Sequence, residues 1–453
     1  MVEWGDPLKY FFEQLSTFSD QPCMVCDDQS FTYAELVEQT LAFQNQVADM
    51  VPAGSVVGAQ VEYSFPCVAL FLALALNRNI IIPLSKDAAQ KHEDYITIGR
   101  VQYLVSLDDK NGLKVLETSS IILDNEFYDH LRSDKHSGLV LFSSGSSGPP
   151  KGIVHDLDRL VGAYKTSGKA YRTLIFLQMD HIGGINTLLY NLRNGGTLVA
   201  PGSRLPEAVC QCIQANQVEL LPTSPTFLNL MILSEMTSRY DLSSLKLITY
   251  GTEPMPEGTL RRVRGLLPHV RFKQTYGLSE TGILQTRSKE DSSLWIKIGG
   301  DGFKTRIKDN KLWIKSDYSM LGYLNAGNPF ENDGYINTGD VVEQDGDWLK
   351  ILGRESELIN VGGNKVFPAE VEEVLQAMPE VEDVLVYGMA NPLTGQMVAA
   401  IVKTRTEMPL SGFKSRMREF CRSRLEPYKI PVKVGISEEN LYSERFKKKR
   451  KFN

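Results

Sequence analysis

The stretch of the sequence richest in groups that could do chemistry runs from Leu139 to Asp156 and reads LVLFSSGSSGPPKGIVHD. An apolar run typical of a β-strand leads into a loop of serines and glycines, which ends at Lys151 and Gly152. Glycines let the backbone approach a ligand closely. Hydroxyls and backbone N–H groups donate to anions, and a lysine adds a point charge that suits phosphate oxygens. The stretch predicts a phosphate-binding loop rather than a flexible solvated one, and it is not a Walker A loop, because Gly152 follows Lys151.

The whole chain has the composition of an ordinary globular protein with two or three domains. It has 453 residues, a net charge of -6, 42% hydrophobic residues and 23% charged residues, and such a length leaves room for a large core. The acidic balance argues against a nucleic-acid-binding protein. The longest apolar run, Cys67 to Leu76, is about half of a membrane span. The six cysteines are scattered, which predicts reduced thiols. We therefore expect a cytoplasmic protein without a membrane span.

Predicted helices and strands alternate over most of the chain. Thr32 is a plausible helix N-cap, with Glu35 three residues later as the partner of a capping box. Strands are expected at 55–61, 80–84, 103–107, 120–123, 173–179, 196–200, 218–222, 245–250 and 270–274, and helices at 31–50, 66–76, 188–192, 205–217 and 225–233. This alternation predicts parallel βαβ units.

The predicted secondary structure changes in character twice in the last third of the sequence. Residues 300–352 read as short strands and turns, and the segment after Gly353 and Arg354 reads as a compact α+β domain of domain-like size. The predicted fold class is α/β, with a large N-terminal domain of βαβ subdomains plus a β-rich section, and a small mobile α+β C-terminal domain. The predicted boundaries are 1–353 and 354–453.

Four further motifs follow the serine- and glycine-rich loop in order. They are YGLSETG at 276–282, YINTGD at 335–340, GRESELI at 353–359 and GGNKVFPAEVE at 362–372. The series resembles the adenylate-forming superfamily of acyl- and aryl-CoA synthetases, peptide-synthetase adenylation domains and luciferases, over essentially the whole chain. The resemblance implies a two-step reaction, in which a carboxylate attacks the α-phosphorus of ATP and a thiol then displaces AMP from the acyl-adenylate.

The resemblance also implies a nucleotide site. The loop would cradle the β- and γ-phosphates, Glu280 would bind Mg²⁺, and Thr281 would contact the α-phosphate. Asp340, reinforced by Arg354, would accept hydrogen bonds from the ribose, and Tyr276 would flank the adenine together with the segment 250–253. A solvated Glu280 and a turn-stabilising Asp340 are the alternatives. The expected ATP- and AMP-binding residues are Ser143, Ser144, Gly145, Ser146, Ser147, Gly148, Lys151, Gly251, Thr252, Glu253, Tyr276, Gly277, Thr281, Asp340 and Arg354.

The acid pocket implied by the resemblance lies around His181, which is also expected to act in catalysis together with Thr281 and Lys447. Amino-acid-activating relatives place an aspartate just after the His181 position, where this chain has Ile182, so the acid is expected to lack an α-amine. The expected pocket residues are His181, Ile182, Asn186, Tyr250, Gly251, Gly277 and Leu278.

The catalytic lysine is expected near the C-terminus. The family pattern is a Gly-Lys pair with an arginine three residues on, whereas here the sequence is FKKKR at 446–450, with Phe446 in place of the glycine. An ammonium between the carboxylate and the α-phosphate offsets the repulsion of two anions. Lys447 fits the pattern, Lys448 and Lys449 are alternatives, and a solvated basic tail is the further alternative.

The small domain is expected to rotate between the two half-reactions. Ser356 falls at the family's hinge position, and Gly362 and Gly363 are expected to line a thiol tunnel, with a plain hairpin turn as the alternative. The predicted function is that of an acyl- or aryl-CoA ligase that uses ATP, Mg²⁺, a small carboxylic acid and coenzyme A. Two alternatives remain: an enzyme that loads a carrier-protein phosphopantetheine, and a non-catalytic nucleotide-binding protein on the same scaffold.

Overall fold

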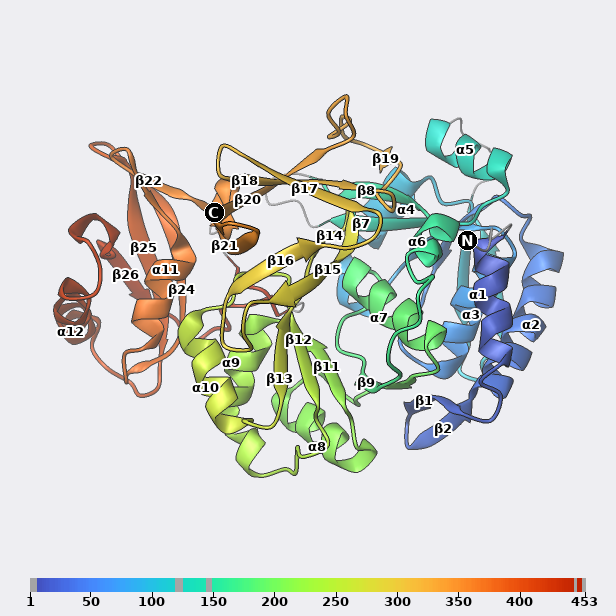
Figure 1. Ribbon diagram of the computed structural model, residues 1–453, viewed down its shortest axis with the longest axis horizontal. Helices are drawn as coiled ribbons and strands as arrows, with labels where there is room; N and C mark the ends of the chain where they lie inside the picture. The colour runs from blue at the N-terminus through green and yellow to red at the C-terminus, as the bar shows by residue number, and fades with distance from the viewer. Residues whose placement is uncertain (1–5, 119–124, 144–148, 444–445, 450–453) are drawn as a thin grey trace.

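The structure, a computed structural model, describes residues 6–118, 125–143, 149–443 and 446–449. A large body carries three seven-stranded sheets, and a small domain with a five-stranded sheet lies at its side (Figure 1). The predicted loop residues 144–148 and the predicted strand at 120–123 fall outside the described residues. Within the described ranges, no helix combines the length and apolar character needed to cross a membrane.

The first sheet has the strand order β19-β8-β7-β4-β3-β5-β6. Its strands are β3 (Val56–Ala59), β4 (Ile80–Pro83), β5 (Tyr103–Leu107), β6 (Leu113–Glu117), β7 (Gly138–Ser143), β8 (Lys151–Asp156) and β19 (Gly322–Tyr323). The predicted parallel pairing is confirmed for β3, β4, β5 and β7, whereas β6, β8 and β19 pair antiparallel. The serine- and glycine-rich loop joins β7 directly to β8, and a short connection of this kind returns a strand antiparallel.

Helices cover both faces of this sheet. They are α1 (Pro7–Ser16), α2 (Tyr33–Met50), α3 (Phe65–Leu76), α4 (His92–Gly99), α5 (Glu126–Asp134) and α6 (Leu157–Gly162). The predicted capping box is confirmed, since Thr32 and Glu35 exchange hydrogen bonds at the start of α2. The helix α3 is apolar all round and almost completely buried, as expected for a helix enclosed in a core.

The second sheet has the order β13-β12-β11-β9-β10-β1-β2 and is parallel except for the β1–β2 pair. Its strands are β1 (Pro22–Cys26), β2 (Gln29–Thr32), β9 (Arg172–Leu174), β10 (Thr197–Val199), β11 (Leu220–Thr223), β12 (Leu247–Tyr250) and β13 (Arg271–Gln274), and its helices are α7 (Ile182–Arg193), α8 (Pro206–Asn216), α9 (Pro225–Ser234) and α10 (Glu257–Leu266). Because parallel strands end at one edge, the loops after β11, β12 and β13 meet there.

The third sheet is antiparallel throughout and confirms the predicted β-rich section. Its strands are β14 (Tyr276–Leu278), β15 (Gly282–Ser288), β16 (Trp295–Gly299), β17 (Phe303–Lys308), β18 (Lys311–Ser316), β20 (Ile336–Asp345) and β21 (Trp348–Arg354). It begins with the YGLSETG motif and ends at Arg354, so the motifs of the sequence lie at its rims.

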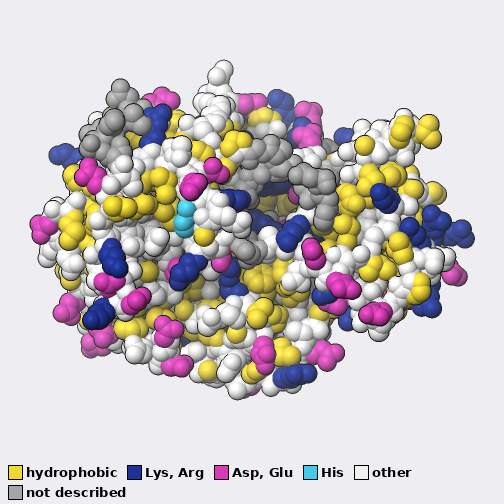
Figure 2. Space-filling model, turned by 180° about the vertical axis from the view of Figure 1, so that it is seen from behind, with side chains coloured by type: hydrophobic (Ala, Val, Ile, Leu, Met, Phe, Trp, Pro, Cys, Tyr) yellow, Lys and Arg dark blue, Asp and Glu magenta, His cyan; other side chains and the backbone are white. Residues whose placement is uncertain are grey.

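The small domain has its own apolar core. Its elements are β22 (Ile359–Val361), β23 (Asn364–Val366), α11 (Pro368–Gln376), β24 (Val381–Asn391), β25 (Gly395–Thr404), α12 (Leu410–Arg422) and β26 (Lys433–Ile436). Short 3₁₀ helices lie at η1 (Lys86–Lys91), η2 (Met236–Ser238), η3 (Glu355–Glu357) and η4 (Pro427–Lys429). Lysine and arginine side chains gather on the outer edge of the small domain (Figure 2). Arg418 and Arg422 of α12 are exposed. The boundary at 353/354 remains a prediction.

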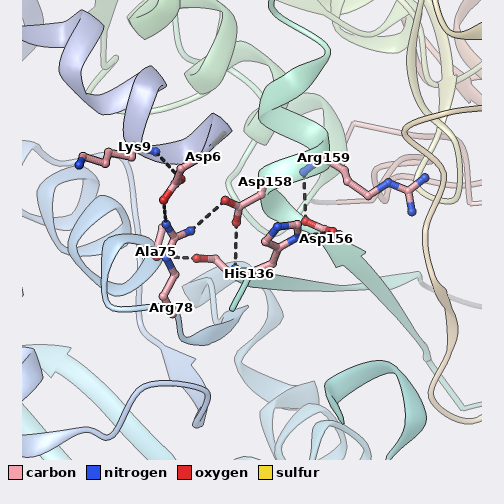
Figure 3. Close-up of polar contacts among 9 residues, drawn as sticks. Asp6, Lys9, Ala75, Arg78, His136, Asp156, Asp158 and Arg159 are labelled. Atoms are coloured by element: carbon pink, nitrogen blue, oxygen red, sulfur yellow. Dashed lines mark hydrogen bonds and ion pairs between the residues drawn. The ribbon is translucent and has the colours of Figure 1, made fainter. Parts of the chain in front are cut away.

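A charged network ties the N-terminal helix to the first sheet (Figure 3). Arg78 pairs with Asp6, which caps α1, and its Nη1 lies 2.8 Å from Oδ1 of Asp158. The other carboxylate oxygen of Asp158 accepts a hydrogen bond of 2.9 Å from the backbone N–H of Ser137 at the start of β7. The Asp158 side chain is 1% exposed, so Arg78 supplies the charge that its burial requires.

The same network extends to His136 and Asp156. The His136 Nδ1 lies 2.8 Å from Oδ2 of Asp156, whose Oδ1 accepts a hydrogen bond of 3.0 Å from the N–H of Arg159 at the start of α6. The side-chain atoms of His136, Asp156 and Asp158 that could bind a metal ion lie within 4.8 Å of one another. Since Arg78 already neutralises Asp158, we interpret this cluster as a structural one.

We predict that Arg78→Met lowers the free energy of unfolding by about 3 kcal/mol, because it leaves the Asp158 carboxylate buried and unpaired. The double variant Arg78→Met/Asp158→Asn should recover part of that loss, since the buried charge is gone. The exposed pair of Lys86 with Glu62 is the control, and Lys86→Met should cost no more than about 1 kcal/mol. Urea denaturation measures all three, and equal losses in the Arg78 and Lys86 variants would contradict the assignment.

Candidate active site

Two adjoining cavities lie where the second sheet meets the third. The α7 cavity, of about 210 Å³, lies between the start of α7 and the ends of β11 and β12. The Tyr276 cavity, of about 140 Å³, lies between the loop after β12 and the rim of the third sheet. Both are lined by Gly251, Thr252, Thr275, Gly277, Leu278, Arg354 and Lys447. We call this set the shared wall.

The backbone of the shared wall depends on two glycines. A Cβ on Gly251 would lie 2.6 Å from Oγ1 of Thr275, and one on Gly277 would lie 2.6 Å from the carbonyl oxygen of Gly282. Between them, Thr252 has a φ of 73°, a left-handed conformation that is a genuine outlier for a β-branched residue. Such strain gathers at functional sites, where the surrounding structure enforces it.

A buried carboxylate anchors one side of the Tyr276 cavity. The Asp340 side chain accepts a hydrogen bond from the hydroxyl of Tyr276, and its Oδ1 lies 3.3 Å from Nε of Arg354. Asp340 is 6% exposed. Burial raises the pKa of its carboxyl above the ordinary value, and the charge of Arg354 opposes that rise. Burial, followed by the nearby Asp340, also raises the pKa of the Tyr276 hydroxyl. Asp340 thus presents hydrogen-bond acceptors at the cavity edge, which suits a ligand with hydroxyl groups.

A second carboxylate, Glu280, lies at the mouth of the α7 cavity. Its Oε1 accepts a hydrogen bond of 2.8 Å from the hydroxyl of Tyr323, and its backbone oxygen accepts one of 2.8 Å from Met320. The Nζ of Lys151 lies 5.0 Å above the ring of the same Tyr323. Lys151, Glu280, Tyr323 and Arg354 line a further hollow of about 330 Å³. A carboxylate beside two cationic groups could hold Mg²⁺ next to phosphates.

His155, on β8, supports the turn that carries Glu280. Its Nε2–H donates a hydrogen bond of 2.7 Å to the carbonyl oxygen of Ser279. The residue is 0% exposed, and burial lowers the pKa of its imidazole to about 4. A neutral imidazole with its proton on Nε2 therefore holds the turn in place.

Of the three candidate lysines, Lys447 is the one in the shared wall. Lys448 pairs instead with Asp383 of the small domain and donates a hydrogen bond of 2.8 Å to the carbonyl oxygen of Val384. Lys449 is exposed. The three candidate lysines therefore lie in different places, and of these three only Lys447 lines both cavities.

The other predicted pocket residues lie along α7. His181 caps the helix, with its Nδ1 accepting a hydrogen bond of 3.0 Å from the N–H of Gly183. Ile182 and Asn186 line the α7 cavity beside it, and the Asn186 Oδ1 accepts a hydrogen bond of 2.8 Å from Tyr164.

Two of the predicted nucleotide-binding residues lie elsewhere. Glu253 lines the Tyr276 cavity, and its Oε1 accepts a hydrogen bond of 2.7 Å from the N–H of Thr226. Ser143, at the end of β7, lines the α7 cavity.

Two of the predicted site residues, Tyr250 and Thr281, do not present their side chains to either cavity. Tyr250 is 1% exposed and belongs to the apolar cluster on the helical face of the second sheet. Successive side chains of a strand point to opposite faces, so its neighbour Thr249 lines the α7 cavity instead. Thr281 is 0% exposed and lines neither cavity. Its hydroxyl contacts the backbone oxygen of Gly282 at 3.4 Å.

The predicted thiol-tunnel glycines form a hairpin turn between β22 and β23. Gly362 and Gly363 have φ values of 59° and 91°, which glycine adopts without steric cost. They line neither cavity in this arrangement of the domains. Ser356 is exposed within η3, directly after Arg354. The roles assigned to these residues remain predictions.

Several residues of the site were missed from the sequence. His155 and Tyr323 act through partners far along the chain and belong to no recurring local pattern. Asn325 also falls in this class: its side chain accepts a hydrogen bond of 3.0 Å from the N–H of Gly152 and donates one of 2.9 Å to the carbonyl oxygen of Pro150. Thr249 could have been found from the sequence. Successive side chains of a strand point to opposite faces, so Thr249 and its neighbour Tyr250 in β12 face opposite sides.

We predict that acid destabilises the protein through His155. The unfolded imidazole has its ordinary pKa near 6.5, so between pH 6.5 and 4 the unfolded state binds the proton more readily, and stability falls as the pH falls. The contribution is complete above pH 6.5, and its loss toward pH 4 is about 3 kcal/mol. His155→Gln should remove this pH dependence, whereas the same change at the exposed His130 should not. Urea denaturation at pH 4.5 and 7.5 measures it, and unchanged acid sensitivity in His155→Gln would contradict the role.

Comparisons with known proteins agree with this architecture. The profile of AMP-binding enzymes matches residues 11–324, and that of the AMP-binding enzyme C-terminal domain matches residues 370–445. The chain is 27% identical over 323 residues to the long-chain-fatty-acid–CoA ligase FadD13 of Mycobacterium tuberculosis, covering 66% of this chain and 63% of that enzyme. It is 28% identical over 333 residues to the indoleacetate–CoA ligase of Aromatoleum aromaticum, again covering 66% and 63%. These matches thus span somewhat less than two thirds of either relative.

Solved structures of similar fold cover nearly the whole chain. The amide bond synthetase McbA of Marinactinospora thermotolerans superposes with a TM-score of 0.79 at 20% identity, covering 98% of both chains. The o-succinylbenzoate CoA synthetase of Bacillus subtilis, solved with an acyl-adenylate, gives a TM-score of 0.75 at 20% identity, covering 97% of this chain and 96% of that one. At such identities the likeness shows the fold. The family profile covers more than half of the sequence, and the chain belongs to the family of AMP-binding, adenylate-forming enzymes.

Proposed function

We propose that this chain is an AMP-forming acid–thiol ligase that activates a compact carboxylic acid with ATP and transfers the acyl group to coenzyme A. The observation that carries the proposal is the position of Lys447 in the wall between two cavities. One cavity lies between α7 and strand ends, and the other is bordered by the buried Asp340. This arrangement suits two substrates whose reacting ends meet at a cation.

The Tyr276 cavity would hold the nucleoside of ATP. Asp340 would accept hydrogen bonds from the ribose hydroxyls, since its carboxylate is fixed by Tyr276 and Arg354. Residues 251–253 would flank the adenine opposite Tyr276. Lys151 and the loop before it would contact the terminal phosphates. Glu280 would hold Mg²⁺, which would offset the phosphate charge.

In the first step, a carboxylate oxygen of the acid attacks the α-phosphorus, and the bond to the bridging oxygen of the β-phosphate breaks, so that pyrophosphate leaves. Two anions must approach each other in this step. The ammonium of Lys447 would lie between them and lower the cost of that approach. In the second step, a thiol sulfur attacks the acyl carbonyl, the bond between the acyl carbon and the phosphate oxygen breaks so that AMP leaves, and the proton of the thiol passes to solvent.

The α7 cavity favours a compact acid without an α-amine. Leu177, Ile182, Pro222 and Ile283 contribute apolar side chains to its lining, which also carries polar groups. Amino-acid-activating relatives place an aspartate just after the position of His181, where this chain has Ile182. Its volume of about 210 Å³ is below the roughly 300–1,000 Å³ of sites for drug-sized ligands. An aryl or short-chain acid fits this size better than a long acyl chain.

Coenzyme A is the thiol favoured by the relatives, since the two curated enzymes described above are CoA ligases by name. Rotation about Ser356 would bring the Gly362–Gly363 turn to the site for this step. Because both residues are glycines, the backbone of that turn carries no side chains at these positions, which would let a pantetheine arm pass. A carrier-protein phosphopantetheine is the alternative acceptor.

We predict that Lys447→Ala lowers ATP–pyrophosphate exchange at least about 100-fold, as for the loss of one preorganised electrostatic group. Thioester formation from a synthetic acyl-adenylate should stay near the wild-type rate, because that step does not bring two anions together. The neighbouring Lys449→Ala, an exposed lysine two residues on, is the matched control and should exchange normally.

The exchange assay with a panel of aryl, short-chain and long-chain acids tests the function itself. We expect exchange with aryl or short-chain acids in the presence of Mg²⁺. Absence of exchange with every acid would reject the ligase and favour a nucleotide-binding protein without catalysis. Acyl transfer to a carrier protein but not to coenzyme A would reject coenzyme A as the acceptor.

A further inference from the structure

The residue before Lys447 is inserted into the core of the large domain. Phe446 is 7% exposed and belongs to the apolar cluster of the second sheet. Its ring centroid lies 5.1 Å from that of Phe176, 5.3 Å from that of Phe227 and 5.6 Å from that of Tyr442. The guanidinium of Arg204 lies 5.6 Å above the ring. We call this surrounding set the aromatic slot.

The backbone of Phe446 is fixed to the same region. Its carbonyl oxygen accepts a hydrogen bond of 2.9 Å from the hydroxyl of Ser224, which is itself 0% exposed and caps α9. The next residue but one, Lys448, reaches the small domain through its ion pair with Asp383. Lys447 therefore stands between an anchor in the large domain and a contact with the small one.

The conformation of Phe446 makes this anchor informative. Its φ is 51°, a left-handed conformation in which a side chain crowds the following carbonyl group, whereas glycine adopts it freely. A phenylalanine is therefore retained here at a conformational cost that glycine would avoid. The burial of its ring among three aromatic rings offsets that cost. A glycine would leave the slot empty and the segment free to move.

We propose that Phe446 is the positioning residue for Lys447: its ring in the aromatic slot holds the C-terminal segment on the large domain and keeps the ammonium of Lys447 in the shared wall. The catalytic part of this inference rests on the proposed function. The anchoring of the segment by Phe446 is independent of that function. A reacting group displaced by about 1 Å can lose about 100-fold in rate, so loss of the ring should affect the step that needs Lys447 and spare the other.

Trypsin tests the anchor without any need for activity. Cleavage after Lys447 and Lys448, followed by mass spectrometry, should be at least about 10-fold faster in Phe446→Ala than in the wild type, because cleavage follows the population of the released segment. Phe446→Leu, which refills much of the slot, should stay near the wild-type rate. Phe420→Ala, which removes a ring from the cluster of the small domain, is the matched control and should be cleaved after these lysines like the wild type.

The two half-reactions test the positioning. In Phe446→Ala we expect kcat for ATP–pyrophosphate exchange to fall about 10- to 100-fold, with the KM for ATP within about 2-fold of the wild type and partial recovery in Phe446→Leu. Thioester formation from a synthetic acyl-adenylate should proceed at the wild-type rate or above. Equal loss of both half-reactions, or wild-type cleavage by trypsin in Phe446→Ala, would overturn the inference. Faster cleavage together with a wild type that exchanges with no acid would support the anchor and reject the proposed function alone.

Discussion

The arrangement of this protein depends on one buried carboxylate. Asp340 receives the hydroxyl of Tyr276 and the guanidinium of Arg354, and these three residues come from three strands of the β-rich sheet. A buried charge must be paired and hydrogen-bonded, so the cluster joins the first strand of this sheet to its last two. The strand β22, which opens the sheet of the small domain, begins at Ile359, shortly after Arg354. The same contact that shapes the Tyr276 cavity thus lies close to the start of that sheet.

The second constraint is topological. The parallel strands β11, β12 and β13 end at one edge, and the residues that follow β12 and β13 build much of the wall between the two cavities. Close packing there requires Gly251 and Gly277. The wall carries two cationic side chains: Arg354 from the β-rich sheet, and Lys447 from the end of the chain remote in sequence. The residue before Lys447, Phe446, packs against Phe176 and Phe227, which follow strands β9 and β11 of the second sheet. The position of Lys447 therefore depends on the order of these strands.

Much of this site could be predicted from the sequence because the motifs pair residue types with fixed spacings. Tyr276, Asp340 and Arg354 do meet, and the capping box of α2 formed as expected. The motif does not specify that the Tyr250 side chain faces the apolar cluster, because a strand end presents alternate residues to opposite faces. His155 acts on a residue 124 positions away, and no local pattern reports such a contact. The departure at Phe446 was visible, but its φ of 51° and its slot emerge from the fold.

The most direct test of the whole account is a crystal structure with an acyl-sulfamoyl-adenosine, a stable mimic of the acyl-adenylate. We expect the ribose hydroxyls within hydrogen-bond distance of the Asp340 carboxylate, the adenine against Tyr276, and the acyl group in the α7 cavity beside His181 and Ile182. The ammonium of Lys447 should contact the linker between the acyl and nucleoside parts. An analogue bound elsewhere, or one bound here with Lys447 outside the shared wall, would contradict the account.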